Sequence, residues 1–202
     1  MTEASEPTGV NGVNGAGGPN EAGGTAGWPV AAPLTTRRLR LEPLRAGHAA
    51  EAFPVLADAR LHTWTGERPP TRAEFGARLR RRSAGRSPDG TEGWLNWMLR
   101  LAPDGPLIGT VQATLRTSRE GAGACGCTAE LAWVVGTFAQ GNGYAREAAH
   151  AIARWLRDRG TGTFTAHIRT GHTASESVAR ALGLSPTHTV VDGEIRWSGR
   201  AR

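Results

Sequence analysis

The segment ELAWVVGTFAQGNGYAREAAHAIARWLRDRG, from Glu130 to Gly160, carries the clearest structural pattern in this sequence. Its first six residues alternate between the two faces of a strand, which places Glu130 on the face opposite Trp133. From Gly143 to Arg159, apolar residues recur at intervals of three and four, and this spacing predicts an amphipathic helix that ends at Gly160. A strand, a turn and a long helix therefore follow one another without a gap.

The turn between this strand and this helix, residues 140–145, is rich in small residues. Gly141 and Gly143 allow backbone N–H groups to approach a ligand closely, and the positive end of the helix dipole follows directly. These features predict a seat for phosphate oxygens. Glycines of this kind also close tight connections, so a purely structural turn is the alternative interpretation.

Two segments resemble motifs of one enzyme family. Gln140-x-x-Gly143-x-Ala145 resembles the Gln/Arg-x-x-Gly-x-Gly/Ala pyrophosphate loop of the GNAT superfamily of acyl-CoA N-acyltransferases. Thr173 to Leu184 resembles the Asn-x-x-Ser-x-x-Val-x-x-x-Leu-Gly-Phe stretch of its RimJ/RimL-type branch. The resemblance extends over residues 34–197. It implies an α+β GNAT fold, with a mixed, largely antiparallel central sheet flanked by helices.

The resemblance also implies acetyl-CoA as the acyl donor and assigns residues to it. The pantetheine arm and the reaction's oxyanion would meet main-chain groups around Val134 or Val135, where the central strand of the family splays from its neighbour. His172 stands where the family usually has Asn. The hydrogen bond that this Asn gives to the cofactor or to an active-site water therefore comes from an imidazole, which can titrate near neutral pH, or is lost. The loop residues expected to hold the pyrophosphate are Gln140, Gly141, Asn142, Gly143, Tyr144 and Ala145.

Acyl transfer to an amine requires a neutral amine, a stabilised oxyanion and a proton for the departing thiolate. The resemblance places Glu130 near the position of a family base, with Glu92 and Glu67 as second choices; alternatively, Glu130 only accepts hydrogen bonds from the backbone or arginine. A terminal α-amine, with a pKa near ~8, needs less help than lysine at ~10.4. Ser175 matches the motif's serine as proton donor, and ordinary hydrogen bonding at a helix start is its alternative role.

The acceptor site of the family is walled by a helix-loop-helix region, which here follows residue 48. His62 and Trp64 are candidates for substrate contact, although a tryptophan beside a loop often serves as a packing anchor. A capping box at Thr71 and Glu74 opens a helix through residue 82. The arginines around its end form a solvated helix face or a site for RNA, a ribosomal surface or an acidic substrate; they are Arg78, Arg80, Arg81, Arg82 and Arg86.

The remaining elements follow from local signals. Strands are expected at 34–44, 94–101, 107–116 and 162–168, the last parallel to the central strand because a helix connects them. A helix with a kink or a new start at Pro54 should follow the first strand. A second capping box at Thr173 and Glu176 and a hairpin turn at Asp192-Gly193 complete the order of the GNAT fold.

Composition limits the class of protein. The chain has 202 residues with a net charge of +6, and all 24 basic residues are arginine. We expect residues 1–32 to be a disordered tail and residues 33–202 to be one GNAT domain. Cys125 and Cys127 are too close for a disulfide framework and too few for a zinc site, so we expect inert thiols and no metal.

The sequence indicates a cytoplasmic location, because it has neither a signal peptide nor an apolar run of about 18 residues. Neither a membrane nor nucleic acid is an expected partner; the oligomeric state is open, with a homodimer as one option. The first functional hypothesis is an acetyl-CoA-dependent N-acetyltransferase acting on a protein N-terminus or a small amine. The alternative is a non-catalytic module of the same fold that binds acyl-CoA, RNA or the ribosome.

Overall fold

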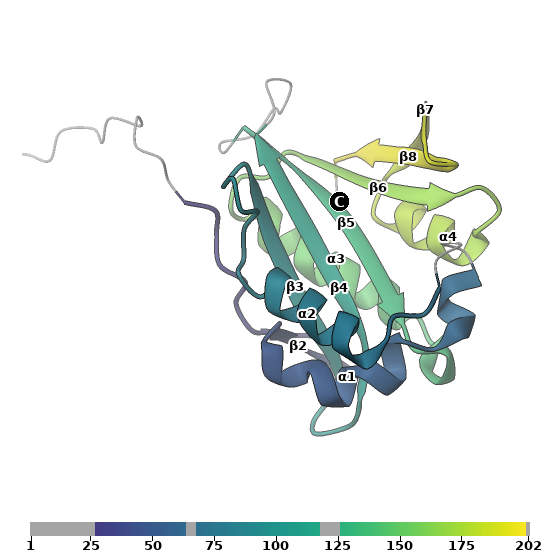
Figure 1. The fold of residues 1–202 in the computed structure, drawn as a ribbon. Helices are drawn as coiled ribbons and strands as arrows, with labels where there is room; N and C mark the ends of the chain where they lie inside the picture. The colour runs from purple at the N-terminus through teal and green to yellow at the C-terminus, as the bar shows by residue number, and fades with distance from the viewer. Residues whose placement is uncertain (1–26, 64–67, 118–125, 201–202) are drawn as a thin grey trace, which may run out of the picture.

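A computed structural model of the chain describes residues 27–63, 68–117 and 126–200. Eight strands of this part form one sheet in the order β1-β2-β3-β4-β5-β6-β8-β7, with helices on both faces (Figure 1). The strands are β1 Leu34–Thr35, β2 Leu39–Pro43, β3 Glu92–Leu101, β4 Leu107–Thr117, β5 Cys127–Val135, β6 Thr163–Arg169, β7 Ser185–Val191 and β8 Glu194–Gly199. The helices are α1 Ala49–Leu56, α2 Arg72–Arg82, α3 Tyr144–Arg157 and α4 Thr173–Ala181.

The sheet is mixed and largely antiparallel, as expected. Neighbouring strands pair antiparallel except β5 and β6, which are joined through α3 and run parallel. This parallel pairing is short, because it covers only residues 128–130 of β5 and 163–165 of β6. Beyond Glu130 the two strands diverge, which is visible in Figure 1.

The two faces of the sheet carry separate hydrophobic clusters. The larger one joins the sheet to α3 and α4, and within it the rings of Trp97 and Trp155 meet edge to face with centroids 5.7 Å apart. The smaller one joins α1 and α2 to β3 and β4 around Phe75, Leu79 and Met98. The alternation of β5 therefore separates two sides of the molecule, with Leu131 buried against the larger cluster.

Several local predictions are confirmed. Thr71 caps α2 in a capping box with Glu74. The new helix start considered at Pro54 is not observed, because Pro54 lies inside α1 and the helix continues through it. Asp192 and Gly193 have φ values of 52° and 79°, as a tight hairpin turn requires.

Two local predictions are wrong. The N-cap of α4 is His172 rather than Thr173, because the imidazole Nδ1 accepts the backbone N–H of Ser175 at 3.3 Å. Thr173 is therefore the first residue inside the helix, and no capping box forms with Glu176. Cys127 takes part in a disulfide rather than remaining a thiol; Cys125 lies outside the described residues.

The chain just before β1 packs onto the sheet. Residues 27–32, which the sequence assigns to the tail, include Trp28 and Ala32 in contact with the larger cluster. The indole N–H of Trp28 donates to the carbonyl oxygen of Gly90 at 3.0 Å, and that of Trp97 donates to Ala32 at 2.7 Å. The described fold thus begins several residues earlier than the sequence suggests.

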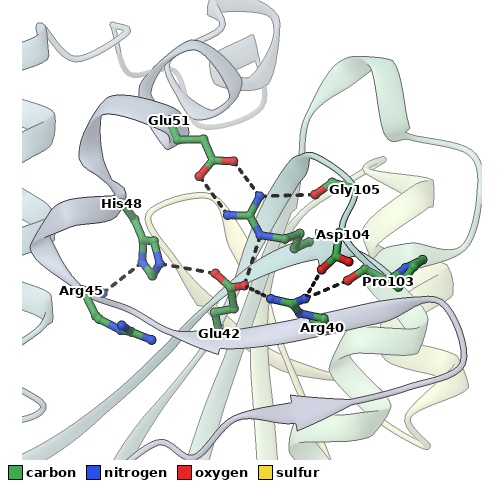
Figure 2. Close-up of polar contacts among 9 residues, drawn as sticks. Arg40, Glu42, Arg45, His48, Glu51, Pro103, Asp104 and Gly105 are labelled. Carbon is green, nitrogen blue, oxygen red and sulfur yellow. Dashed lines mark hydrogen bonds and ion pairs between the residues drawn. The ribbon is translucent and has the colours of Figure 1, made fainter.

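A charge network fastens α1 to the sheet (Figure 2). Glu42 of β2 lies at its centre and pairs with Arg40 at 3.0 Å, with Arg100 at 3.1 Å and with His48 at 3.5 Å. Arg100 also pairs with Glu51 of α1 at 2.7 Å. The network therefore positions α1, one wall of the cavity described below, against β2 and β3.

Candidate active site

The divergence of β5 from β6 leaves backbone groups of β5 without a strand partner. The N–H of Gly136 donates to the carbonyl oxygen of Ile108 at 2.7 Å, toward β4. Because successive residues of a strand direct their amides to alternate sides, Val134 also faces β4, whereas Val135 faces the gap beside β6. The side chain of Gln140 lies at the same gap, since its Nε2 donates to the carbonyl oxygen of Val135 at 3.0 Å.

The loop from Gln140 to the start of α3 has the geometry of an anion seat. Gly141 and Gly143 adopt φ values of 78° and 76°, which other residues reach only with strain. Gly143 is the N-cap of α3 and gives the helix no side-chain cap. The N–H groups of the first turn of α3 therefore have neither an intrahelical acceptor nor a side-chain cap, and they lie at the positive end of a helix of 14 residues.

Arg38, which sequence reasoning missed, adds a positive charge to this loop. Its Nη1 donates to the carbonyl oxygen of Asn142 at 3.0 Å, and its guanidinium lies 4.8 Å from the ring centroid of Tyr144. Glu147 of α3 holds it in place through an ion pair of 2.7 Å. Residue 38 and the loop are more than 100 positions apart, so no local pattern could have linked them.

Glu147 is itself held by the start of the chain. Its carboxylate accepts hydrogen bonds from the hydroxyl of Thr36 at 2.6 Å and from the backbone N–H of Arg38 at 2.9 Å. Burial alone would raise the pKa of Glu147, but the bonds from Thr36 and Arg38 outweigh it and lower that pKa. The carboxylate thus stays ionised and keeps Arg38 beside the loop.

A cavity of about 240 Å³ opens on the face of β5 that lies beneath α1 and α2. Its floor consists of two rows of side chains that cross three strands, because partners in register share a face. These rows are Met98, Thr110 and Val134, and Asn96, Gln112 and Ala132. The cavity therefore lies against the part of β5 that has left β6.

The walls of the cavity come from the helices. Leu56 of α1 and Phe75 and Leu79 of α2 supply apolar surface. Arg78 and Arg82, which are four residues apart on α2, supply cationic groups. His62, a candidate for substrate contact, also lines the cavity. Trp64 and Glu67 lie outside the described residues.

Glu130 lies one row beyond the cavity floor. It faces the same side of β5 as Ala132, but strand geometry places it about 7 Å further along. Its carboxylate pairs with Arg116 at 2.7 Å and with His167 of β6 at 3.2 Å. Glu92, the second choice for a base, pairs with the same Arg116 at 2.7 Å. Both carboxylates thus have ionic partners, and neither lines the cavity.

Ser175 and His172 lie together at the N-terminus of α4. The Nδ1 of His172 accepts the backbone N–H of Ser175, and its Nε2 lies 3.5 Å from the hydroxyl oxygen of Ser175. Since Nδ1 is an acceptor here, the neutral imidazole carries its proton on Nε2 and donates it to this hydroxyl. The hydroxyl proton of Ser175 is then directed elsewhere.

Across the described ranges, no group of three or more His, Cys, Asp or Glu is arranged to hold a metal ion. Within the same residues, no helix is long and apolar enough to span a bilayer.

Comparison with known families identifies the class of protein. The family model of the acetyltransferase (GNAT) domain matches residues 38–185, which is more than half of the chain. The chain therefore belongs to the GNAT acetyltransferase family. No curated protein sequence matches it.

Solved structures agree on the fold. An acetyltransferase of the GNAT family from Bacillus anthracis has a TM-score of 0.66 at 15% identity, covering 84% of this chain and 98% of its own. The aminoglycoside acetyltransferase AAC(6')-Ib in complex with coenzyme A has 0.63 at 15%, covering 80% and 94%. RimL, a ribosomal alpha-N-protein acetyltransferase in complex with coenzyme A, has 0.62 at 13%, covering 82% and 96%. At these identities the likeness concerns the fold alone, which is the GNAT fold expected from the sequence.

Proposed function

We propose that this protein transfers the acetyl group of acetyl-CoA to a primary amine by direct attack on the thioester. A bond forms between the amine nitrogen and the acetyl carbon, the carbon–sulfur bond breaks, and coenzyme A leaves as the thiol with one proton of the amine. The observation that carries the proposal is the divergence of β5 from β6, with an anion seat at one end and a cavity on one face.

The cofactor would lie along the free edge of β5. Residues 140–145 and the first turn of α3 would hold its pyrophosphate, with Arg38 adding a charge-assisted contact. Gln140, whose side chain donates a hydrogen bond to the carbonyl oxygen of Val135, would fix the position of the loop relative to the end of β5. Of the two positions expected for the oxyanion contact, Val135 is the better one, because its N–H faces the gap.

The acceptor amine would enter the cavity beneath α2. Among the described lining residues there is no carboxylate, and Arg78 is cationic. Nearby positive charge disfavours an ammonium ion and so lowers the pKa of a bound amine. An α-amine, whose pKa is already near ~8, would become nucleophilic there with little assistance. This favours a protein N-terminus or a small α-amine, in line with the RimJ/RimL-type motif at residues 173–184.

Proton movements would involve Glu130 and Ser175. Glu130 is one row from the cavity, so it would accept the amine's proton through an intervening water rather than directly. Ser175 would protonate the departing thiolate, since His172 occupies its oxygen as a donor and leaves its hydroxyl proton available. Ser175 would then regain a proton from solvent while Glu130 releases the proton of the amine to solvent, so that overall one proton passes from the amine to the thiol. His172 would thus replace the family's Asn by orienting Ser175.

The proposal is tested by titrating acetyl-CoA into the protein in a calorimeter, with a Gly143→Arg variant. An arginine at Gly143 would adopt a strained φ of 76° and fill the anion seat. Gly90→Arg is the matched control, because Gly90 has a φ of 74° with nothing within 4 Å of its added Cβ and lies outside the loop. We expect micromolar binding that Gly143→Arg abolishes and Gly90→Arg preserves.

The second step is a screen of N-terminal peptides and small amines for release of coenzyme A. Amine-dependent release establishes transfer. Binding of acetyl-CoA without release by any amine would instead favour the non-catalytic acyl-CoA-binding module. Equal loss of binding in both arginine variants would contradict the assignment of the loop.

A further inference from the structure

Glu130 and His167 meet at the point where β5 and β6 separate. Glu130 is the last residue of β5 that pairs with β6, opposite Thr165, and His167 is the next residue of β6 on the same face. The alternate residues of β6, such as Phe164 and Ile168, are buried in the larger cluster on the opposite face. His167 therefore lies on the face of the sheet that carries Glu130 and the cavity floor, at the closed end of the gap.

The contact between the two side chains distinguishes the two ring nitrogens of His167. Its Nδ1 lies 3.2 Å from Oε1 of Glu130, while Oε2 of the same carboxylate accepts a hydrogen bond from Nη1 of Arg116 at 2.7 Å. An ionised carboxylate has no proton to donate, so it favours the proton of a neutral imidazole on Nδ1. The lone pair is then on Nε2, which is the nitrogen that can accept a further proton. The side chain of His167 is 24% exposed, so water can reach the ring.

The charges beside His167 can balance a proton on its ring. Arg116 is shared between two carboxylates, because it pairs with Glu92 and with Glu130 at 2.7 Å each. The hydrogen bond from Trp94 is the main cause that lowers the pKa of Glu92 and keeps that carboxylate ionised. With both carboxylates ionised, these two and Arg116 together carry one net negative charge. A proton on His167 would therefore neutralise the group rather than add an unbalanced charge to the sheet.

We infer that His167 takes the amine's proton and that Glu130 acts through it. The intervening water receives one proton from the amine and passes one of its own to Nε2. An N–H bond of the amine thus breaks, an N–H bond forms on the imidazole, and the water is regenerated. Glu130 positions the ring from its Nδ1 side and balances the imidazolium, which then releases its proton to solvent. This inference rests on the proposed N-acetyltransferase function and refines its proton step.

The kinetic test compares three variants with the intact protein, using the peptide or small amine that gives the fastest release of coenzyme A in the screen. His167→Ala removes both the ring and its contact with Glu130. His167→Asn removes the base but keeps an N–H group near the position of Nδ1, because the amide nitrogen of asparagine is attached to the corresponding carbon. His188→Ala is the matched control, since it removes an exposed imidazole from β7.

We expect His167→Ala and His167→Asn each to lower kcat about 100-fold and to change the KM for acetyl-CoA less than about twofold, because only proton transfer is lost. Imidazole added to the solution should raise the kcat of His167→Ala about tenfold and leave the intact protein unchanged. His188→Ala should keep full turnover. Full turnover in His167→Asn would overturn the inference, since His167 would then only hold Glu130 in place.

A spectroscopic measurement decides the inference even if no amine is acetylated. With the side-chain nitrogens isotopically labelled, nuclear magnetic resonance distinguishes a protonated ring nitrogen from a bare one, and His167→Asn identifies the signals of His167. We expect the neutral ring to carry its proton on Nδ1 and to have a bare Nε2. That result supports the proton-accepting pair even where the transferase proposal fails. A proton on Nε2 with a bare Nδ1 overturns the inference whatever the turnover.

Discussion

At the scale of single residues, the shared partner Arg116 makes it possible to distinguish a catalytic role of Glu130 from a purely structural one. Arg116 pairs with Glu92 and Glu130 at 2.7 Å each. Replacing either carboxylate removes one ion pair from the guanidinium of Arg116. Only Glu130 lies in the row of side chains next to the cavity floor, and only Glu130 pairs with His167. The two variants therefore disturb comparable ion pairs and differ in the proposed catalytic role.

We predict that Glu130→Gln lowers kcat about 100-fold, because the amine loses its proton acceptor, while the Kd for acetyl-CoA changes less than twofold. Glu92→Gln should leave kcat within a few-fold of the intact enzyme. Steady-state release of coenzyme A and calorimetry measure the two quantities. If both variants slow turnover equally, Glu130 acts only through Arg116.

Ser175 and His172, at the N-terminus of α4, have separable roles in turnover and in stability. Ser175→Ala should lower kcat about 100-fold with cofactor affinity intact, because the thiolate loses its proton donor. His172→Ala should also reduce stability by about 1 kcal/mol, since α4 loses its N-cap acceptor, whereas His172→Asn should retain that stability. Chemical denaturation and turnover assays check both effects; full activity in Ser175→Ala would remove the serine from the mechanism.

At the scale of elements, the network around Glu42 makes the attachment of α1 dependent on pH. Burial lowers the pKa of His48, more strongly than the charge of Glu42 raises it. Burial would raise the pKa of Glu42, but hydrogen bonds from Arg100 and Arg40 outweigh it and lower that pKa. The hydrogen bond from Arg100 lowers the pKa of Glu51. All three groups thus bind protons more tightly in the unfolded chain than in the folded protein.

These lowered pKa values determine how the stability of the folded protein changes with pH. The stability contributed by His48 is complete above its ordinary pKa of 6.5 and is lost as the pH falls below that value. The two carboxylates add a further loss below 4.5. We therefore predict that Tm falls between pH 7 and pH 5, and that His48→Gln flattens this part of the curve. Fluorimetric melting across this range measures it; an unchanged slope in His48→Gln would assign the effect to other groups, such as His150.

At the scale of the whole molecule, residues 27–32 close one side of the core. Trp28 lies directly over β3, because a Cβ on Gly93 would come within 2.7 Å of its ring. We predict that Trp28→Ala lowers the free energy of unfolding by about 2 kcal/mol through lost burial. Val30→Ala is the control, since Val30 is 84% exposed and its loss should be within about 0.5 kcal/mol. Equal denaturation midpoints for the two variants would show that this segment adds nothing to the fold.

Much of the fold was predictable because its signals are local. The alternation of β5, the spacing of α3 and the glycines at 141 and 143 each depend on residues that are neighbours in the chain. The cap of α2 and the turn at Asp192 have the same character. The cap of α4 escaped prediction because an imidazole took the place of the more common hydroxyl.

Local patterns were enough to predict the order of the elements, the GNAT family and the position of the glycine loop before α3, because period, capping and glycine placement act over a few residues. The positions of the charged side chains depend on tertiary packing. It brought Arg38 to the loop across more than 100 residues, turned Arg78 and Arg82 into the cavity, and set Glu130 one row outside it. These outcomes depend on strand register and helix packing, which are long-range contacts that no local pattern encodes.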